Sequence, residues 1–226
     1  MHQDYIKGVK GAIPIVLGYM PIGMAFGILA VQQGLSVYDI FLMSLLVYAG
    51  SAQFISVAMI ASGAVMMSII MTTFLVNLRH LLMSASLSPF LKHIPSKAQA
   101  LISYGITDET YAVAITQVSQ QKMSGRYFAG LHITSQLGWV ISTVVGGLLG
   151  GMMPNPTRWG IDFALSAMFI ALLIMQIDNK KKVLVSICAA GISILIAMSL
   201  KGNWHIIISA VLGATIGVII ESWSKK

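Results

Sequence analysis

Residues 64–91 read AVMMSIIMTTFLVNLRHLLMSASLSPFL, an apolar run with one permanently charged side chain, Arg79, near its middle. A run of about 20 apolar residues is long enough to cross the hydrocarbon core of a bilayer as an α-helix. A guanidinium at that depth costs at least roughly 2.5–3.5 kcal/mol, so a chain retains it where it faces protein or water and serves a function. This stretch therefore predicts a membrane helix that borders a polar pathway.

The rest of the chain has the composition of a membrane protein. Of its 226 residues, 57% are hydrophobic and 9% are charged, against roughly 25% charged in soluble domains. Three long segments carry no charge at all: residues 11–38, 40–78 and 127–157. We therefore predict an all-α polytopic membrane protein with a single transmembrane domain over residues 1–226. The one cysteine, Cys188, cannot form an internal disulfide.

We expect about eight transmembrane helices, or seven if the tight turn at Ser62-Gly63 makes a neighbouring segment re-entrant. The predicted spans are Gly8–Val31, Tyr38–Ala61, Ala64–Leu91, Ala98–Val118, Tyr127–Met152, Gly160–Ile177, Val183–Leu200 and Trp204–Ser222. Lys and Arg favour cytoplasmic loops. With the N-terminus inside, only Lys92, Lys97, Arg158 and Lys201 fall in outer loops, so both termini are predicted to be cytoplasmic. The formal charge of +7 is thus explained without nucleic-acid binding.

Two of the predicted spans carry residues that interrupt helices. Pro21 in the first span removes a backbone donor and predicts a kink, and Gly23 and Gly27 form a pair that favours close helix packing. In the second span, the stretch Tyr48-Ala49-Gly50-Ser51-Ala52-Gln53-Phe54 is either a helix contact or a helix break. A break would direct freed N–H groups at an anion. Gly50, Ser51 and Gln53 are therefore candidate binding residues.

The third span carries a polar stripe. Thr73, Asn77, His80, Ser84 and Ser88 recur at intervals of three or four residues, which places them on one helix face. Such a stripe faces protein or a wet cavity, because lipid offers it no partners. His80 is either a hydrogen-bonded core imidazole or a proton-coupling group, since the ordinary pKa of histidine is about 6.5. Arg79 either forms a buried ion pair or grips a substrate carboxylate.

The acidic residues that could form an ion pair with Arg79 lie in the fourth predicted span. Asp108 and Glu109, in Thr107-Asp108-Glu109-Thr110, fall midway through it. If that span is continuous, both carboxylates lie at bilayer depth and are paired or wet. The alternative is a break after Gly105, with Thr107 capping a new helix and the acids in its first turn. Asp162 lies at the start of the sixth span, where an interfacial acid is expected.

Five motifs in order resemble those of the AzlC/YgaZ family, the large subunits of bacterial branched-chain amino acid exporters. They are Pro21-Ile-Gly23-Met-Ala-Phe26-Gly27, Tyr48-Ala-Gly-Ser-Ala-Gln-Phe54, Asn77-Leu-Arg-His80, Thr107-Asp-Glu109 and Gly160-Ile-Asp162-Phe-Ala164. The resemblance covers residues 7–177. It implies export of valine, leucine and isoleucine, in some members methionine, from the bacterial cytoplasmic membrane. It also implies a small membrane partner of the AzlD/YgaH type, encoded separately.

The residues fit such a substrate on their own. A zwitterion needs a cation or N–H cluster for its carboxylate, which Arg79 or the Gly50 region offers, and an acceptor for its ammonium, which Asp108, Glu109 or Gln53 offers. Asn77 lies on the same helix face as His80. No phosphate-binding Gly-x-x-x-x-Gly-Lys-Ser/Thr motif occurs, and no cofactor is expected. We therefore predict a secondary, proton-coupled transporter rather than an enzyme; a passive channel or uniporter and an intramembrane hydrolase are the alternatives.

Overall fold

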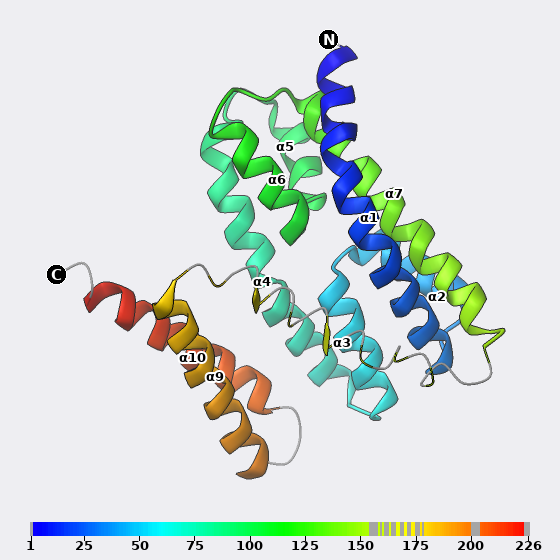
Figure 1. The fold of residues 1–226 in the computed structure, drawn as a ribbon, viewed down its shortest axis with the longest axis vertical. Coiled ribbons are helices and arrows are strands. Elements are labelled where there is room, and N and C mark those ends of the chain that lie inside the picture. Colours follow the sequence, from blue (N-terminus) through cyan, green and yellow to red (C-terminus); the bar gives the residue numbers. More distant parts are fainter. Residues whose placement is uncertain are drawn as a thin grey trace. The chain divides into compact units, whose positions relative to one another are not determined.

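The computed structural model describes residues 2–153, 158, 160, 163, 166–167, 170, 173–174, 177, 179–199 and 204–223. The regular elements in this part of the chain are all helical, as predicted (Figure 1). They are α1 (His2–Gln32), α2 (Val37–Leu42), the π-helix η1 (Met43–Val47), α3 (Gly50–Ala61), α4 (Met66–Leu91), α5 (Ser96–Tyr104), α6 (Asp108–Val118), α7 (Gly125–Gly150), α9 (Lys180–Ser199) and α10 (Trp204–Trp223). Most of the predicted span 160–177, with Asp162, lies outside the described residues.

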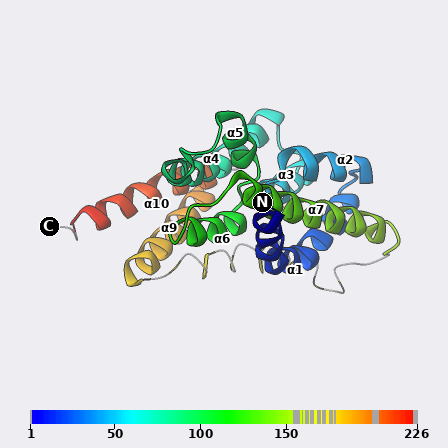
Figure 2. The ribbon, with the colours of Figure 1, turned by 90° about the horizontal axis from the view of Figure 1, so that it is seen from above.

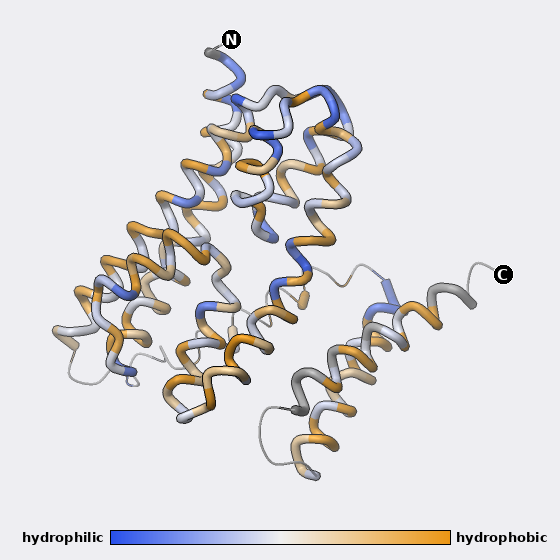
Figure 3. Tube along the Cα trace, turned by 180° about the vertical axis from the view of Figure 1, so that it is seen from behind, coloured by the Kyte–Doolittle hydropathy of each residue, from blue (hydrophilic) through white to orange (hydrophobic). Residues whose placement is uncertain are grey.

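The chain divides into two compact units, residues 1–63 with 76–165 and residues 64–75 with 166–226. Four of the described helices are long and apolar enough to cross a membrane: Gln3–Gln32, Met66–Leu91, Gly125–Gly150 and Lys180–Ser199. Hydrophobic colour runs along most of the helix lengths, and hydrophilic colour gathers near the end of the first unit that holds the N-terminus (Figure 3). In the second unit α9 and α10 pack antiparallel, with Gly213 against Ala189 and Gly217 against Val185.

The frame of the first unit is the pair α1 and α7, which lie side by side in both views (Figures 1 and 2). Gly8 packs on the backbone of Tyr127, and Gly27 packs on the backbone of Thr143 and Gly147, so the two helices run parallel. A Cβ added to Gly27 would lie 2.0 Å from the Thr143 carbonyl oxygen. The glycine pair therefore allows close packing, as the packing interpretation predicted. Helix α1 continues through Pro21 without interruption.

The second predicted span, Tyr38–Ala61, is broken into a hairpin of α2–η1 and α3. The left-handed backbone of Tyr48, with φ 43° and ψ 47°, ends the π-helix, and α3 begins at Gly50. Across the tip, Gln53 Nε2 donates to Ser44 Oγ at 3.1 Å, so the two arms face each other. The break also frees the carbonyl of Leu45, which accepts from Gln136 Nε2 at 3.0 Å and from the Tyr104 hydroxyl.

The fourth predicted span, Ala98–Val118, is also two half-length helices, and its interpretation as one continuous crossing is wrong. Helix α5 has 9 residues and α6 has 11, about half the length needed to cross the hydrocarbon core at 1.5 Å per residue. His93 Nε2 donates to the Met123 carbonyl at 2.8 Å, so the outer ends of this second hairpin are neighbours. An apolar run of sufficient length cannot by itself distinguish one crossing from two half-crossings.

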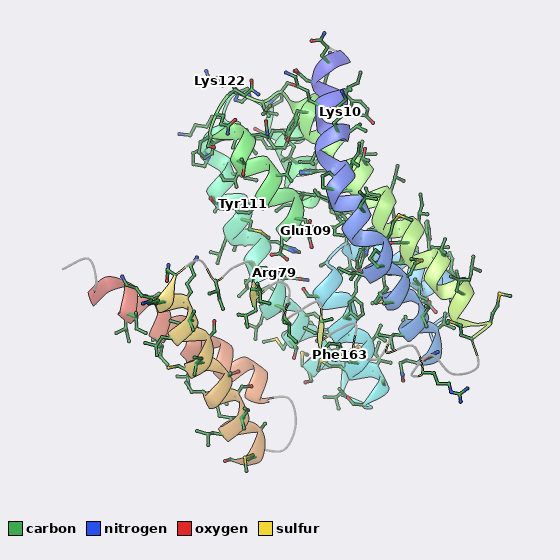
Figure 4. The ribbon with its side chains drawn as sticks, viewed as in Figure 1. Lys10, Arg79, Glu109, Tyr111, Lys122 and Phe163 are labelled. Carbon is green, nitrogen blue, oxygen red and sulfur yellow. The ribbon has the colours of Figure 1, made fainter. Side chains whose placement is uncertain are left out.

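This packing corrects the predicted sidedness of the loops. Lys92 and Lys97, which were assigned to the side opposite Lys122, flank the His93–Met123 contact and therefore lie at the same end as Lys122. The N-terminal segment joins them there, because Ser124 Oγ donates to Asp4 Oδ2 at 2.7 Å. Lys10 and Lys122 lie near this end of the unit (Figure 4).

Candidate functional site

The tips of the two hairpins meet at Arg79. Its Nη1 lies 2.7 Å from Asp108 Oδ2, at the start of α6, and its Nη2 donates to Ser51 Oγ, at the start of α3. The side chains of Arg79 and Asp108 are 27% and 24% exposed, so the ion pair is mostly buried but part of it remains accessible. Figure 4 shows Arg79 on α4 and Glu109 on α6. The arginine thus joins three elements that are far apart in the sequence.

Both helix starts at this point carry the partial positive charge of a helix N-terminus. Helix α6 is closed by a capping box, in which Thr110 N donates to Thr107 Oγ1 at 3.2 Å and Thr107 N donates to Thr110 Oγ1 at 2.7 Å. Helix α3 has no capping box, and the side chain of its N-cap residue, Ala49, accepts no hydrogen bond from the helix N–H groups. The first N–H groups of a helix have no partner inside it, so the start of α3 is the better anion site.

Glu109 is held next to the arginine pair but bonded to a different group. The hydroxyl of Tyr19, on α1, donates to Glu109 Oε2 at 2.8 Å and lies 2.7 Å from Thr107 Oγ1. In the part of the chain that the structure describes, Glu109 forms no ion pair. Its carboxylate is therefore fixed in position without a balancing cation.

A buried network behind the tip of the first hairpin fixes the start of α3. Gln53 is fully buried; its Oε1 accepts from Trp139 Nε1 at 3.0 Å and its Nε2 donates to Ser44. Ser44 in turn accepts from Thr143 Oγ1 at 2.8 Å. Both ends of the Gln53 amide are engaged with protein groups, so Gln53 positions the helix start.

Three buried polar atoms on one turn of α4 have no hydrogen-bond partner among the described residues. They are Asn77 Oδ1, Arg79 Nε and His80 Nε2. Buried polar groups in native proteins are nearly always hydrogen-bonded, so each such orphan calls for an explanation such as water or a ligand. Their clustering beside the Arg79–Asp108 pair identifies this turn as the polar side of the site.

The structure brings together most of the residues singled out in the sequence, namely Gly50, Ser51, Asn77, Arg79, His80, Asp108 and Glu109. It adds Tyr19 and Trp139, which the sequence reading missed. One sequence feature could have pointed to Trp139: it lies in the middle of a predicted span, whereas membrane tryptophans are enriched at the interfaces. Tyr19 had no such feature, because its contacts come from α6, about 90 residues away in the chain.

Known proteins resemble this chain over most of its length. Residues 14–153 match the model of a protein family described as AzlC protein. Inner membrane protein YgaZ of Escherichia coli (strain K12) is 29% identical over 193 residues, 83% of this chain and 79% of YgaZ. Branched-chain amino acid transport protein AzlC of Bacillus subtilis (strain 168) is 29% identical over 196 residues, 86% of this chain and 76% of that protein. An uncharacterized membrane protein of Helicobacter pylori (strain ATCC 700392 / 26695) is 31% identical over 78% of both chains. No solved structure matches.

Proposed function

The chain belongs to the AzlC family, and from this premise we propose that it is the large subunit of a secondary transporter that exports branched-chain amino acids. The substrates proposed are valine, leucine and isoleucine, with methionine as a further candidate. The protein works in the bacterial cytoplasmic membrane together with a small AzlD/YgaH-type membrane subunit. The name of the Bacillus subtilis relative supports transport of this substrate class. The observation that carries the proposal is the meeting of two helix starts at Arg79.

The substrate carboxylate binds between Arg79 and the start of α3. Arg79 Nε has no partner among the described residues, and the uncapped N–H groups at Gly50 and Ser51 point out of the same helix end. A helix N-terminus and a guanidinium both favour a carboxylate. Asn77, on the same turn of α4 as Arg79, orients it further.

The substrate ammonium binds at Glu109. This carboxylate is held by Tyr19 without an ion-pair partner in the described part of the chain. Asp108 is already paired with Arg79 and keeps the arginine in place. Export of an aliphatic amino acid then requires an apolar surface for its side chain next to the carboxylate and ammonium positions.

The charges at the site support coupling to protons. Among the described residues of the site, Arg79 carries one positive charge against the two carboxylates of Asp108 and Glu109, so one negative charge is unbalanced when no substrate is bound. An unbalanced charge at bilayer depth is costly. Uptake of a proton at His80 or Asp108 offsets that charge and links transport to the pH gradient.

The test is transport by the two subunits together in membrane vesicles. Vesicles preloaded with labelled valine, leucine or methionine are expected to lose label faster with both subunits than without them, and faster still under a pH gradient. Equal loss with and without the two subunits would contradict the proposed function. Faster loss that ignores the pH gradient would favour a passive uniporter instead.

A further inference from the structure

A cavity of about 400 Å³ lies between α5 and α7, and neither Arg79 nor Asp108 lines it. This volume is within the range of about 300–1,000 Å³ found for small-molecule sites. Its walls are mainly apolar, with Leu101, Phe128 and Ile133 among them. Three polar side chains also line it: Tyr104, His132 and Gln136.

Among the polar side chains that line this cavity, His132 has a ring nitrogen without a hydrogen-bond partner in the described residues. Its side chain is 6% exposed, and its Nε2 has no hydrogen-bond partner in the described residues. The ring is held on its other edge by Gly105, since a Cβ there would lie 2.2 Å from Nδ1. A fixed, buried and unpaired imidazole nitrogen in an apolar cavity suits a ligand that is mostly aliphatic and has a polar end.

Tyr104 and Gln136, which also line the cavity, are already bonded to protein groups. Gln136 Nε2 donates to the Tyr104 hydroxyl at 2.8 Å, and both side chains donate to the Leu45 carbonyl. The Tyr104 ring lies 6.4 Å from the ring of Tyr48, centre to centre. Tyr48 is the residue at the tip of the first hairpin, two positions before Gly50. The contact between the two tyrosines therefore links the cavity lining to the tip of the first hairpin.

We propose, on the basis of the proposed function, that this cavity holds the transported amino acid before it reaches Arg79. The aliphatic side chain lies against Leu101, Phe128 and Ile133, and a polar end of the amino acid bonds to His132 Nε2. The Tyr48–Tyr104 contact connects this position to the first hairpin, which carries the helix start at Gly50. An acyl chain from the bilayer is the rival occupant, but its methylene groups would leave the imidazole nitrogen unpaired, which costs free energy in a buried place.

The chain's single cysteine allows a direct test. In a Cys188→Ser background, Ala129→Cys places a thiol in the cavity wall, and Leu137→Cys places one on the same helix outside the lining. The full transporter in vesicles is treated with N-ethylmaleimide. At leucine about ten times its dissociation constant, only about one tenth of the sites stay open, so Ala129→Cys is expected to react about tenfold more slowly. Glycine added in place of leucine lacks the aliphatic side chain and is expected not to slow the reaction of Ala129→Cys. The Leu137→Cys control is expected to react with N-ethylmaleimide at the same rate with and without leucine.

A second variant tests the imidazole. His132→Phe keeps a ring against Gly105 but removes Nε2, so the leucine concentration that gives half-protection of Ala129→Cys should rise about five- to tenfold, the usual value of one hydrogen bond. An unchanged concentration would overturn the role of His132. The cavity proposal fails if leucine never protects Ala129→Cys, or if only added lipid does, while the same vesicles still export leucine. Protection without any leucine export would instead contradict the proposed function and leave the cavity as a leucine site.

Discussion

Arg79 contacts protein groups from two hairpins at once, and this geometry depends on the shape of a guanidinium. One nitrogen meets Asp108 and another meets Ser51, while a third, Nε, has no partner among the described residues. A lysine ammonium is a compact charge on a flexible stem and cannot reproduce this fork. The contacts show one role of the residue, pairing with an acid, and the proposed function adds a second, binding the substrate carboxylate.

We predict that Arg79→Lys inserts at a normal level but exports leucine at least about tenfold more slowly, because a positive charge remains for Asp108 while the fork is lost. The measurement is vesicle efflux normalised to the amount of folded protein. Arg126→Lys is the matched control, since Arg126 is exposed. Normal export by Arg79→Lys would show that the arginine only pairs with Asp108, and loss of folded protein in Arg79→Ala would support that view.

For His80 we predict a separation of two activities. His80→Gln keeps a hydrogen-bonding side chain at the site but cannot titrate. Exchange of one amino acid for another should continue at about the normal rate, while uphill export driven by a pH gradient should disappear. Both are measured in the same vesicles with and without the gradient. If His80→Gln still concentrates leucine normally, the carboxylates of Asp108 and Glu109 become the coupling groups.

At the scale of elements, the first unit contains a tightly packed helix pair, two hairpins of half-length helices and residues 76–91 of α4. Five glycines of α1 and α7 would place an added Cβ within 2.3 Å of an atom on the facing helix: Gly8, Gly23, Gly27, Gly130 and Gly146. At the tip of the second hairpin only side-chain atoms lie this close, since a Cβ on Gly105 would lie 2.2 Å from His132 Nδ1; helix starts and polar side chains meet at the tips of both hairpins. The pair α1–α7 is therefore the rigid part against which the tips are positioned.

The prediction for this helix pair compares two glycines of α1. Gly27→Ala should destabilise the protein by several kcal/mol, above the usual overpacking cost of about 1–3 kcal/mol, because the new methyl group meets backbone atoms of α7 that cannot move aside. Gly18→Ala should be neutral or stabilising by up to about 1 kcal/mol, since nothing lies within 4 Å of the new Cβ. Thermal unfolding of the purified proteins in detergent measures both. Equal stability of the two variants would contradict the packing of α1 on α7.

The elements also show which features the sequence could predict. The motif residues around Arg79 were recognisable, because a charge, a polar stripe and paired acids in apolar runs each carry a cost that needs a reason. The break after Gly105 was recognisable as an alternative from the Thr107 cap. The return of α6 to the side where α5 began was not, because it depends on packing against α1 and α4, as in the Tyr19–Glu109 and Arg79–Asp108 contacts.

At the scale of the whole molecule, the hairpins change the expected course of the chain through the membrane. The loop before α5 and the loop after α6 lie together, as the His93–Met123 bond requires. The cationic residues of the first unit near this end are then on one side: Lys7, Lys10, Lys92, Lys97, Lys122 and Arg126. A cytoplasmic location for this end agrees with the positive-inside rule better than the arrangement with eight full crossings.

This arrangement predicts the labelling of introduced cysteines in intact cells. In the Cys188→Ser background, Lys97→Cys and Lys122→Cys should react with a membrane-impermeant maleimide from the same side, together with Lys10→Cys. If that side is the cytoplasm, all three react only after the membrane is permeabilised. Labelling of Lys97→Cys from outside while Lys122→Cys stays protected would restore a continuous crossing over 98–118 and contradict the second hairpin.

The glycine contacts along α1 and α7 have a consequence for how the gene can change. Every codon change that replaces a glycine adds at least one carbon atom, so Gly8, Gly23, Gly27, Gly130 and Gly146 have no conservative substitute. In a saturation library selected for growth on a toxic amino acid, these codons should be depleted of all missense variants, and Gly18 should tolerate many. Natural variation and directed evolution of this transporter would then be confined to the hairpins and the cavity walls, where a change of substrate preference can arise without separating the two helices.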